Sequence, residues 1–228
     1  MTQKISEKDN FIALTLGLVL LLLAQAAAAQ FFEARAQRWV QSLFIITLVI
    51  LIWGVKEKNK WYLSTLGFVG SVFSVVLITA ILDSVNFGYL QLVLLLAFFT
   101  SSSITVAKQV LFSGEIDGNK IMGSICLYIL MALVWAVIYS LCHLSFDGAF
   151  TMVEHGPWYQ IFSTFLYFSF VTITTLGYGD ISPTVPVTEF FVYMEALAGQ
   201  FYIAILVASL VGAKMSQRNS SNNNKEIK

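Results

Sequence analysis

Long apolar stretches recur along this chain, and they constrain its fold more than any other feature. A helix needs about 20 predominantly apolar residues to cross the hydrocarbon core of a bilayer. Six stretches meet or approach that length: residues 11–32, 39–55, 61–82, 88–107, 120–144 and 188–213. Hydrophobic residues make up 57% of the sequence and charged residues only 11%, whereas soluble domains average about 25% charged residues. The sequence therefore predicts an all-α membrane protein with six transmembrane helices.

The basic residues are distributed unequally among the loops between these stretches. If both termini are cytoplasmic, the cytoplasmic side carries most of the basic side chains: Lys4, Lys8, Lys56, Lys58, Lys60, Lys108, Lys120, Lys214, Arg218, Lys225 and Lys228. The opposite side then carries only Arg35 and Arg38. Because cytoplasmic loops are enriched in Lys and Arg, we expect both termini to be cytoplasmic and residues 157–187 to face outward.

Residues 1–30 have a second interpretation. They combine a Lys-bearing start, an apolar run and an Ala-Gln-Ala stretch, which together resemble a secretory signal peptide with its cleavage site. Cleavage would leave five crossings. The apolar run has about 20 residues, longer than the roughly 7–15 of a signal-peptide core, and we therefore expect a retained helix.

Charge and motif content argue against several function classes. The formal net charge is +0 and no dense basic run occurs, so nucleic acid is not an expected partner. Cys126 and Cys142 lie about 24 Å apart on one predicted helix and cannot pair within it. No metal-ligand spacing surrounds them, and no His-Glu-x-x-His or Gly-x-Ser-x-Gly motif occurs. The sequence predicts neither an enzyme nor a bound cofactor.

Residues 157–187 are too polar and too rich in Gly and Pro for a simple crossing. Pro157 suits the first position of a helix, because its missing N–H would be unpaired there. Residues 158–174 then form a predicted helix of about 25 Å, which enters the membrane from outside and needs an extended return. Non-helical backbone survives at that depth only where protein buries it or where it lines a water-filled path.

The predicted return is Thr175-Leu176-Gly177-Tyr178-Gly179. A row of backbone carbonyls aimed in one direction can replace the water around a cation. Such a row needs alternate residues in left-handed conformations, which Gly177 and Gly179 adopt at little steric cost. Leu176 and Tyr178 would then point away from the axis, and Thr175 would add a hydroxyl. The negative end of the preceding helix favours a cation just below this segment.

This segment resembles the selectivity filter of the pore-loop potassium channels, which reads Thr-Val-Gly-Tyr-Gly. Leu176 replaces the valine, and Asp180 followed by Ile181-Ser182-Pro183 extends the likeness. The resemblance implies a bacterial six-helix channel in the inner membrane, with K⁺ as the permeant ion and the lipid bilayer around it. Because the motif occurs once, four identical chains would have to close the ring.

The resemblance covers about residues 120–213 and implies four parts. They are a cytoplasmic N-terminal tail at 1–10, a four-helix membrane domain at 11–112, a pore domain at 113–213 and a disordered cytoplasmic tail at 214–228. The tail is rich in Asn and Ser, which is typical of disorder. In voltage-gated relatives the fourth helix bears several basic residues, whereas residues 88–107 bear none. We therefore expect no steep voltage gating.

In the last predicted helix, Gly199 falls where the family usually has its hinge glycine. The resemblance implies that Gly199, Ile203, Val207 and Val211 line the pore, since a spacing of four places them on one helix face. A lipid-facing apolar stripe would have the same spacing.

Support for the predicted filter departs from the family pattern. Many relatives carry tryptophans in the pore helix at positions that here look like Tyr167 and Phe168. Tyr167 can hydrogen-bond Asp180, whereas Phe168 cannot donate to the Tyr178 hydroxyl, so Thr172 is the candidate for that role.

Some bacterial channels have a buried glutamate behind the filter, where this chain has Val171. Glu195, in the last helix, is a carboxyl that is costly in a membrane unless it is solvated or paired. We expect Glu195 to face the pore helix and bond Ser169 or Thr172, and the alternative is exposure to a water-filled cavity.

Other functions remain open from the sequence alone. His143 and His155 fall at the predicted outer end, so external acid is a candidate stimulus, although histidines at an interface need no such role. A potassium transporter could reuse a pore loop, but such transporters carry four unlike repeats on one long chain. A non-conducting membrane scaffold or sensor would use the first four helices instead.

Overall fold

The computed structural model describes residues 10–31, 85–111, 118–154 and 156–226, and the regular elements in these residues are helices. They are α1 (Asn10–Phe31), α4 (Val85–Leu111), α5 (Gly118–Ser145), α6 (Trp158–Ile173) and α7 (Pro186–Glu226). One isolated bridge pairs Phe150 with Pro183. The crossings predicted at 39–55 and 61–82, and His155, lie outside the described residues.

Four of the described helices are long and apolar enough to cross a membrane. The apolar windows are Phe11–Phe31, Gly88–Val110, Lys120–Ser145 and Pro186–Ser209. They agree within a few residues with the predicted crossings at 11–32, 88–107, 120–144 and 188–213. The prediction of an all-helical membrane protein is therefore confirmed for the part of the chain that is described.

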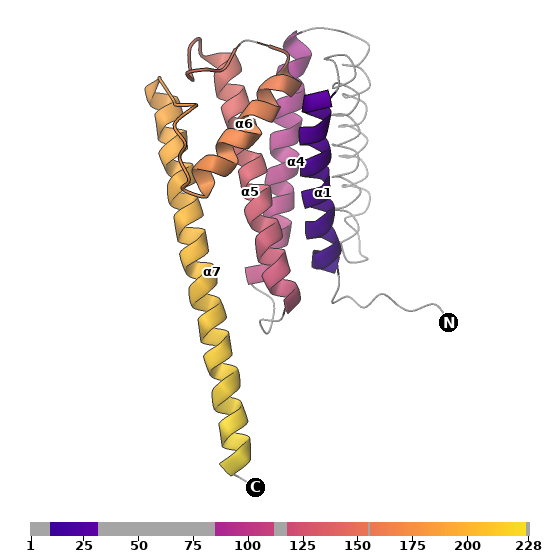
Figure 1. The fold of residues 1–228 in the computed structure, drawn as a ribbon, viewed down its shortest axis with the longest axis vertical. Helices are drawn as coiled ribbons and strands as arrows, with labels where there is room; N and C mark the ends of the chain where they lie inside the picture. The colour runs from indigo at the N-terminus through magenta and orange to yellow at the C-terminus, as the bar shows by residue number, and fades with distance from the viewer. Residues whose placement is uncertain (1–9, 32–84, 112–117, 155, 227–228) are drawn as a thin grey trace, which may run out of the picture.

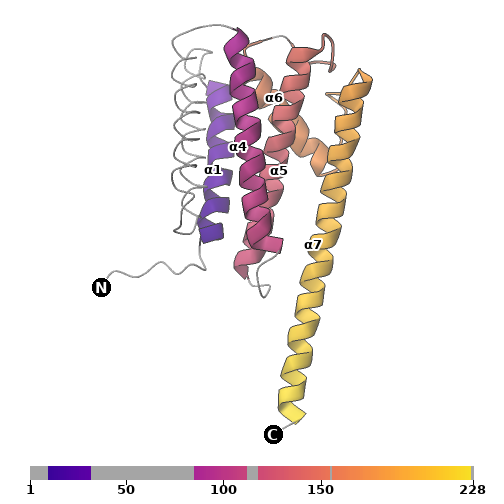
Figure 2. The same ribbon diagram turned by 180° about the vertical axis from the view of Figure 1, so that it is seen from behind.

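The described helices form a bundle in which α7 stands at one side. Figures 1 and 2 show α1, α4 and α5 as neighbours, α6 slanted across α5, and α7 beyond α6. A Cβ atom on Gly123 would lie 2.7 Å from Val110 Cγ2 and 3.2 Å from Phe11 Cδ2, so α5 begins where α4 ends and α1 begins. At the opposite end, the Tyr89 hydroxyl of α4 donates to the carbonyl of Leu144.

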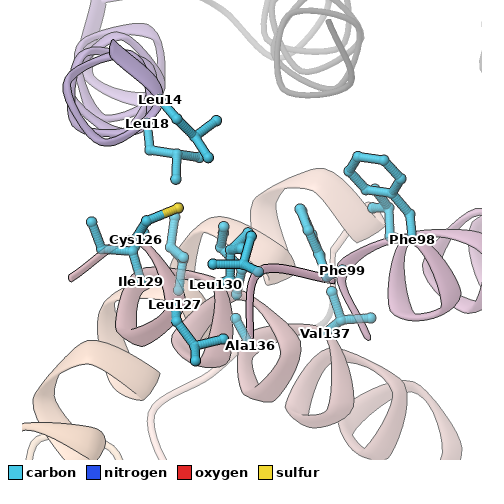
Figure 3. Packing of buried hydrophobic residues seen from close by; sticks show 14 of the residues in the cluster. Leu14, Leu18, Phe98, Phe99, Cys126, Leu127, Ile129, Leu130, Ala136 and Val137 are labelled. Atoms are coloured by element: carbon cyan, nitrogen blue, oxygen red, sulfur yellow. The ribbon is translucent and has the colours of Figure 1, made fainter. Parts of the chain in front are cut away.

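Close packing holds α1 and α4 against α5. Figure 3 shows Leu14 and Leu18 of α1 pointing toward Cys126 of α5, and Leu14, Leu18, Phe99 and Leu130 are almost completely buried. Because lipid tails are as apolar as leucine, these contacts stabilise the bundle through packing and not through removal from water. Cys126 and Cys142, both in α5, are buried and free.

Aromatic side chains fix α6 against α5 in a second cluster. The ring centroids of Phe150 and Phe165 lie 4.6 Å apart, and those of Tyr139 and Phe168 lie 5.2 Å apart in an edge-on arrangement. Such aromatic pairs gain about 0.5–1.5 kcal/mol beyond area burial. The cluster contributes to the slanted position of α6, and hence to the place where α6 ends.

Two expectations about helix ends are wrong. Pro157 has extended backbone (φ −64°, ψ 145°) and is the N-cap residue of α6, whose first helical residue is Trp158; its carbonyl accepts from the amides of Gln160 and Ile161. The disorder expected from residue 214 is not found either, because α7 continues to Glu226. Extending an existing helix adds one hydrogen bond per residue without a new nucleus, which offsets the polar composition.

Candidate functional site

Helix α6 and the segment that follows it enter and leave the bundle at the same end. Figure 1 shows α6 slanting inward and the chain then returning beside α7 toward the end where α7 begins. Helix α6 has 16 residues, about 24 Å of helix, which is less than the roughly 30 Å of a hydrocarbon core. The chain therefore turns back after Ile173, as expected for residues 157–187.

The last carbonyls of α6 are used to fix this turn. Leu176 N and Gly177 N both donate to Val171 O, at 3.0 and 3.2 Å, and Thr175 N donates to Thr172 O at 2.9 Å. The last four carbonyls of a helix have no partner within the helix. Three amides of the following segment thus bind the end of α6 and set where the extended return begins.

Backbone conformation alternates along residues 175–179. Thr175, Gly177 and Gly179 have positive φ angles of 60°, 57° and 78°, and Leu176 and Tyr178 do not. The left-handed conformations expected for Gly177 and Gly179 are present. A positive φ at Thr175 was not foreseen, and a non-glycine residue in that region costs about 1–3 kcal/mol, as is common at functional sites. An alternation of this kind can turn successive carbonyls to one side of the chain.

Residues 174–180 are all exposed in the single chain. Leu176 is 56% exposed and Tyr178 is 65% exposed, although both side chains are large and apolar or aromatic. A segment of this kind, at the depth of a bilayer, must be covered by protein or line a water-filled path. One copy of the described residues does not provide that cover.

Asp180 is held by two hydrogen bonds just after the alternating segment. The Tyr167 hydroxyl of α6 donates to Oδ2 at 2.8 Å, and the Ile181 amide donates to Oδ1 at 3.1 Å. The bond that the sequence suggested between Tyr167 and Asp180 is therefore present. This hydrogen bond raises the pKa of Tyr167 above its ordinary value, so Tyr167 remains a donor over the physiological pH range.

Phe168 and Thr172, the other two positions considered as support for the filter, make contacts that the sequence did not predict. Phe168 is buried against Tyr139 and Phe150, so its ring supports the position of α6. Thr172 contributes its carbonyl, which accepts from the Thr175 amide. A contact between the Thr172 side chain and the Tyr178 hydroxyl stays a prediction.

Glu195 is completely buried where α5, α6 and α7 meet. Ser169 Oγ lies 2.5 Å from Glu195 Oε1, which is the pairing the sequence predicted, and the Tyr139 hydroxyl donates to Oε2. The alternative, a carboxyl exposed to a cavity, is wrong for this chain because the side chain is 0% exposed. Tyr139 was missed, because α5 carries several hydroxyl groups and the sequence does not indicate which of them faces Glu195.

Gly199 lies against the end of α6, one turn after Glu195. A Cβ atom there would lie 2.3 Å from Ile173 O and 2.8 Å from Ile173 Cγ1. Tyr128 of α5 donates to the same carbonyl at 2.7 Å. The expectation that Gly199 lies on an open, pore-lining face is therefore wrong within this chain, because the face is occupied by Ile173.

Beyond Gly199 the same side of α7 is open. Ile203 is 41% exposed and Val207 is 53% exposed, because α6 ends at Ile173 and nothing from it reaches these turns. Val211 belongs to α7, but its side chain lies outside the described residues. Figure 2 shows the same separation of the lower part of α7 from the other helices.

Comparisons with known proteins find similarity in this region of the chain. A family described as "Ion channel" matches residues 127–215, which include α6, the alternating segment and Glu195. A two-pore potassium channel 3 from Arabidopsis thaliana is 48% identical over 46 residues, which is 20% of this chain and 11% of that protein. No solved structure matches. Residues 127–215 are thus similar to ion channels, and a 46-residue stretch of the chain is similar to part of a potassium channel.

Proposed function

We propose that the chain is one quarter of a homotetrameric channel that conducts K⁺ passively through backbone carbonyls of Thr175, Leu176, Gly177, Tyr178 and Gly179. The observation that carries the proposal is the alternation of positive φ angles at residues 175, 177 and 179 in an exposed segment directly after α6. Carbonyls aimed together can replace the hydration shell of a K⁺ ion. The family match to ion channels supports the same function.

The proposal of four copies follows from what one copy leaves open. The alternating segment is exposed, and α7 is buried over only a small part of its apolar window. A carbonyl ring needs several equivalent strands around one axis, and a closed cyclic arrangement of identical chains provides them. In this arrangement the pore domain is residues 113–213, and Ile203, Val207 and Val211 line the inner path.

Asp180, Tyr167, Thr172 and Glu195 are proposed as support for the filter. The hydrogen bond between Tyr167 and Asp180 joins the outer end of the filter to α6, and the Thr172 carbonyl binds its inner end. We place the protein in a bacterial inner membrane, with both termini cytoplasmic. This orientation rests on the distribution of Lys and Arg and on the six-crossing topology.

A potassium-gradient flux assay in proteoliposomes tests the proposal. We expect flux that prefers K⁺ to Na⁺ and that Ba²⁺ blocks, because Ba²⁺ is close to K⁺ in size and its double charge binds more tightly to carbonyl oxygens. Equal flux of K⁺ and Na⁺ would contradict the proposed filter. If a verified tetramer shows no flux at any pH or lipid composition tested, a non-conducting scaffold would be favoured.

Voltage dependence is expected to be weak. Steep voltage gating needs several charges that cross the membrane field, and Lys108, in the last turn, is the basic residue that α4 offers. Current recorded from reconstituted protein over a range of potentials should therefore give an apparent gating charge of at most about one. A clearly larger value would show that charges outside α4 sense the field.

A further inference from the structure

The surroundings of the Glu195 carboxyl contain hydroxyl groups from two other helices. We call Glu195, Tyr139 and Ser169 the Glu195 junction. Tyr139 of α5 donates to Oε2, Ser169 Oγ of α6 lies 2.5 Å from Oε1, and the Glu195 side chain is 0% exposed. An ionised carboxyl in such a place would cost several kcal/mol unless it were paired with a positive charge. Hydroxyl groups do not supply one.

The hydrogen bonds of Ser169 indicate whether the Glu195 carboxyl is protonated. Ser169 Oγ lies 2.8 Å from the carbonyl oxygen of Ala132, in addition to its contact with Glu195 Oε1. A serine hydroxyl has one proton and donates one hydrogen bond, whereas a carbonyl and an ionised carboxylate only accept. With Glu195 ionised, one of the two contacts would bring two oxygens together without a proton between them.

A protonated Glu195 removes this conflict. Oε1–H then donates to Ser169 Oγ, Ser169 donates to Ala132 O, and Tyr139 donates to Oε2. Each close oxygen–oxygen contact becomes a hydrogen bond, and no charge is buried. The same chain of bonds joins α7 to α6 and α6 to α5.

The Glu195 junction belongs to the contact between α6 and α7, and this contact extends to the residues just before the proposed filter. Ser169 and Ile173 are four residues apart in α6, and Glu195 and Gly199 are four residues apart in α7. Residues at this spacing are neighbours on one helix face, so the Glu195–Ser169 contact and the Gly199–Ile173 contact lie one turn apart. Ile173 precedes Thr175 by two residues, so the position of α7 bears directly on the start of the filter.

We propose that Glu195 is a neutral acid whose proton joins α7 to α6, and that this junction sets the position of α6 and of the filter. The proposal rests on the proposed channel function. Glu195 is a positioning residue, since it acts through Ser169 and does not touch the ion. The titratable groups that face it, Tyr139 and Tyr128 of α5, are phenols that carry no charge at neutral pH.

Infrared spectra of the tetramer in liposomes test the proton directly. Near neutral pH, the difference spectrum of wild type minus Glu195→Gln should contain the C=O stretch of a protonated carboxylic acid. Ser169→Ala should shift that band, because the acceptor of the Glu195 proton is removed. Ser140→Ala is the matched control: Ser140 is also 0% exposed, but its hydroxyl donates to Ala136 O within α5, so the band should not move.

Flux measurements test the positioning role with the same proteins. Glu195→Gln keeps one donor and one acceptor in place, so its K⁺/Na⁺ flux ratio should equal that of wild type. Glu195→Leu removes both and should lower the ratio about tenfold, the effect of losing one or two buried hydrogen bonds. If Glu195→Leu does not assemble, Ser169→Ala should show the lower ratio and Ser140→Ala should not.

Two results would overturn the proposal: carboxylate bands in place of the acid band, or a Gln variant as damaged as the Leu variant. An acid band in wild type without any K⁺ flux would support the neutral junction and count against the proposed channel function.

Discussion

Replacing Gly177 with Ala is expected to abolish K⁺-selective flux. Gly177 has a φ of +57°, and nothing lies within 4 Å of the place a Cβ atom would take, so backbone conformation and not a clash opposes the substitution. An L-residue in the left-handed region costs about 1–2 kcal/mol. Four chains would add about 4–8 kcal/mol around one ring, comparable with the roughly 5.5 kcal/mol that moves a two-state equilibrium from 99:1 to 1:99. The flux assay with Na⁺ competition measures the loss.

Gly148→Ala is the matched control for this variant. Gly148 has a φ of +65° and also has nothing within 4 Å of an added Cβ atom, but it lies in the loop between α5 and α6. The backbone cost per chain is therefore similar, whereas the carbonyls of residues 175–179 are untouched. We expect a small loss of thermal stability and unchanged selectivity. Equal loss of flux in both variants would mean that Gly177 matters for folding and not for the filter.

The sequence predicted the helical part of this fold well, because length and hydropathy determine it. A bilayer leaves few options for a stretch of about 20 apolar residues, and the four described windows agree with the predicted crossings. The end of α7 was predicted wrongly, because composition alone does not include the helix already formed before residue 214.

The backbone of the candidate site was predictable only where glycine marks it. Gly177 and Gly179 signalled their positive φ angles, whereas Thr175, with a φ of 60°, carries no such signal. Its conformation follows from the end of α6, where the Thr175 and Leu176 amides donate to Thr172 O and Val171 O. Such a constraint depends on tertiary structure and leaves no trace in residue type.

For the contacts between helices, the sequence indicated which residue needs a partner but not every residue that supplies one. A carboxyl in an apolar helix requires partners, and this pointed from Glu195 to the hydroxyl-rich α6. Tyr139 and Tyr128 could not be assigned in the same way, since the rotation of α5 about its axis decides which residues face α6. The tilt of α6 depends on ring packing, such as the contact of Phe150 with Phe165.

Replacing Gly199 with Ala is expected to displace α7 from α6 and reduce K⁺ selectivity. The new Cβ atom would lie 2.3 Å from Ile173 O and 3.1 Å from Ile173 C, whereas carbon atoms pack at about 3.5–4.0 Å. The nearest atoms belong to the backbone and cannot rotate away. Overpacking of this kind costs about 1–3 kcal/mol in each chain. The midpoint temperature of thermal unfolding of the tetramer and the K⁺/Na⁺ flux ratio should both fall.

Gly212→Ala, in the same helix, is the control that separates the effect of the clash with Ile173 from the effect of replacing a helical glycine with alanine. Nothing lies within 4 Å of a Cβ atom at Gly212, so this variant should gain about 0.5–1 kcal/mol from helix propensity and keep its selectivity. The double variant Ile173→Ala with Gly199→Ala should not recover, because the closest obstacle is the Ile173 carbonyl oxygen.

The hinge interpretation of Gly199 predicts a different result. A hinge glycine gives α7 freedom to bend, so Gly199→Ala would change how often the channel opens and leave stability and the K⁺/Na⁺ flux ratio intact. The close contact with Ile173 predicts the opposite pattern, since Tyr128 donates to the same carbonyl and both groups would be displaced together. Unchanged selectivity with altered open probability would therefore assign Gly199 to gating, whereas reduced selectivity would assign it to the close packing that positions the filter.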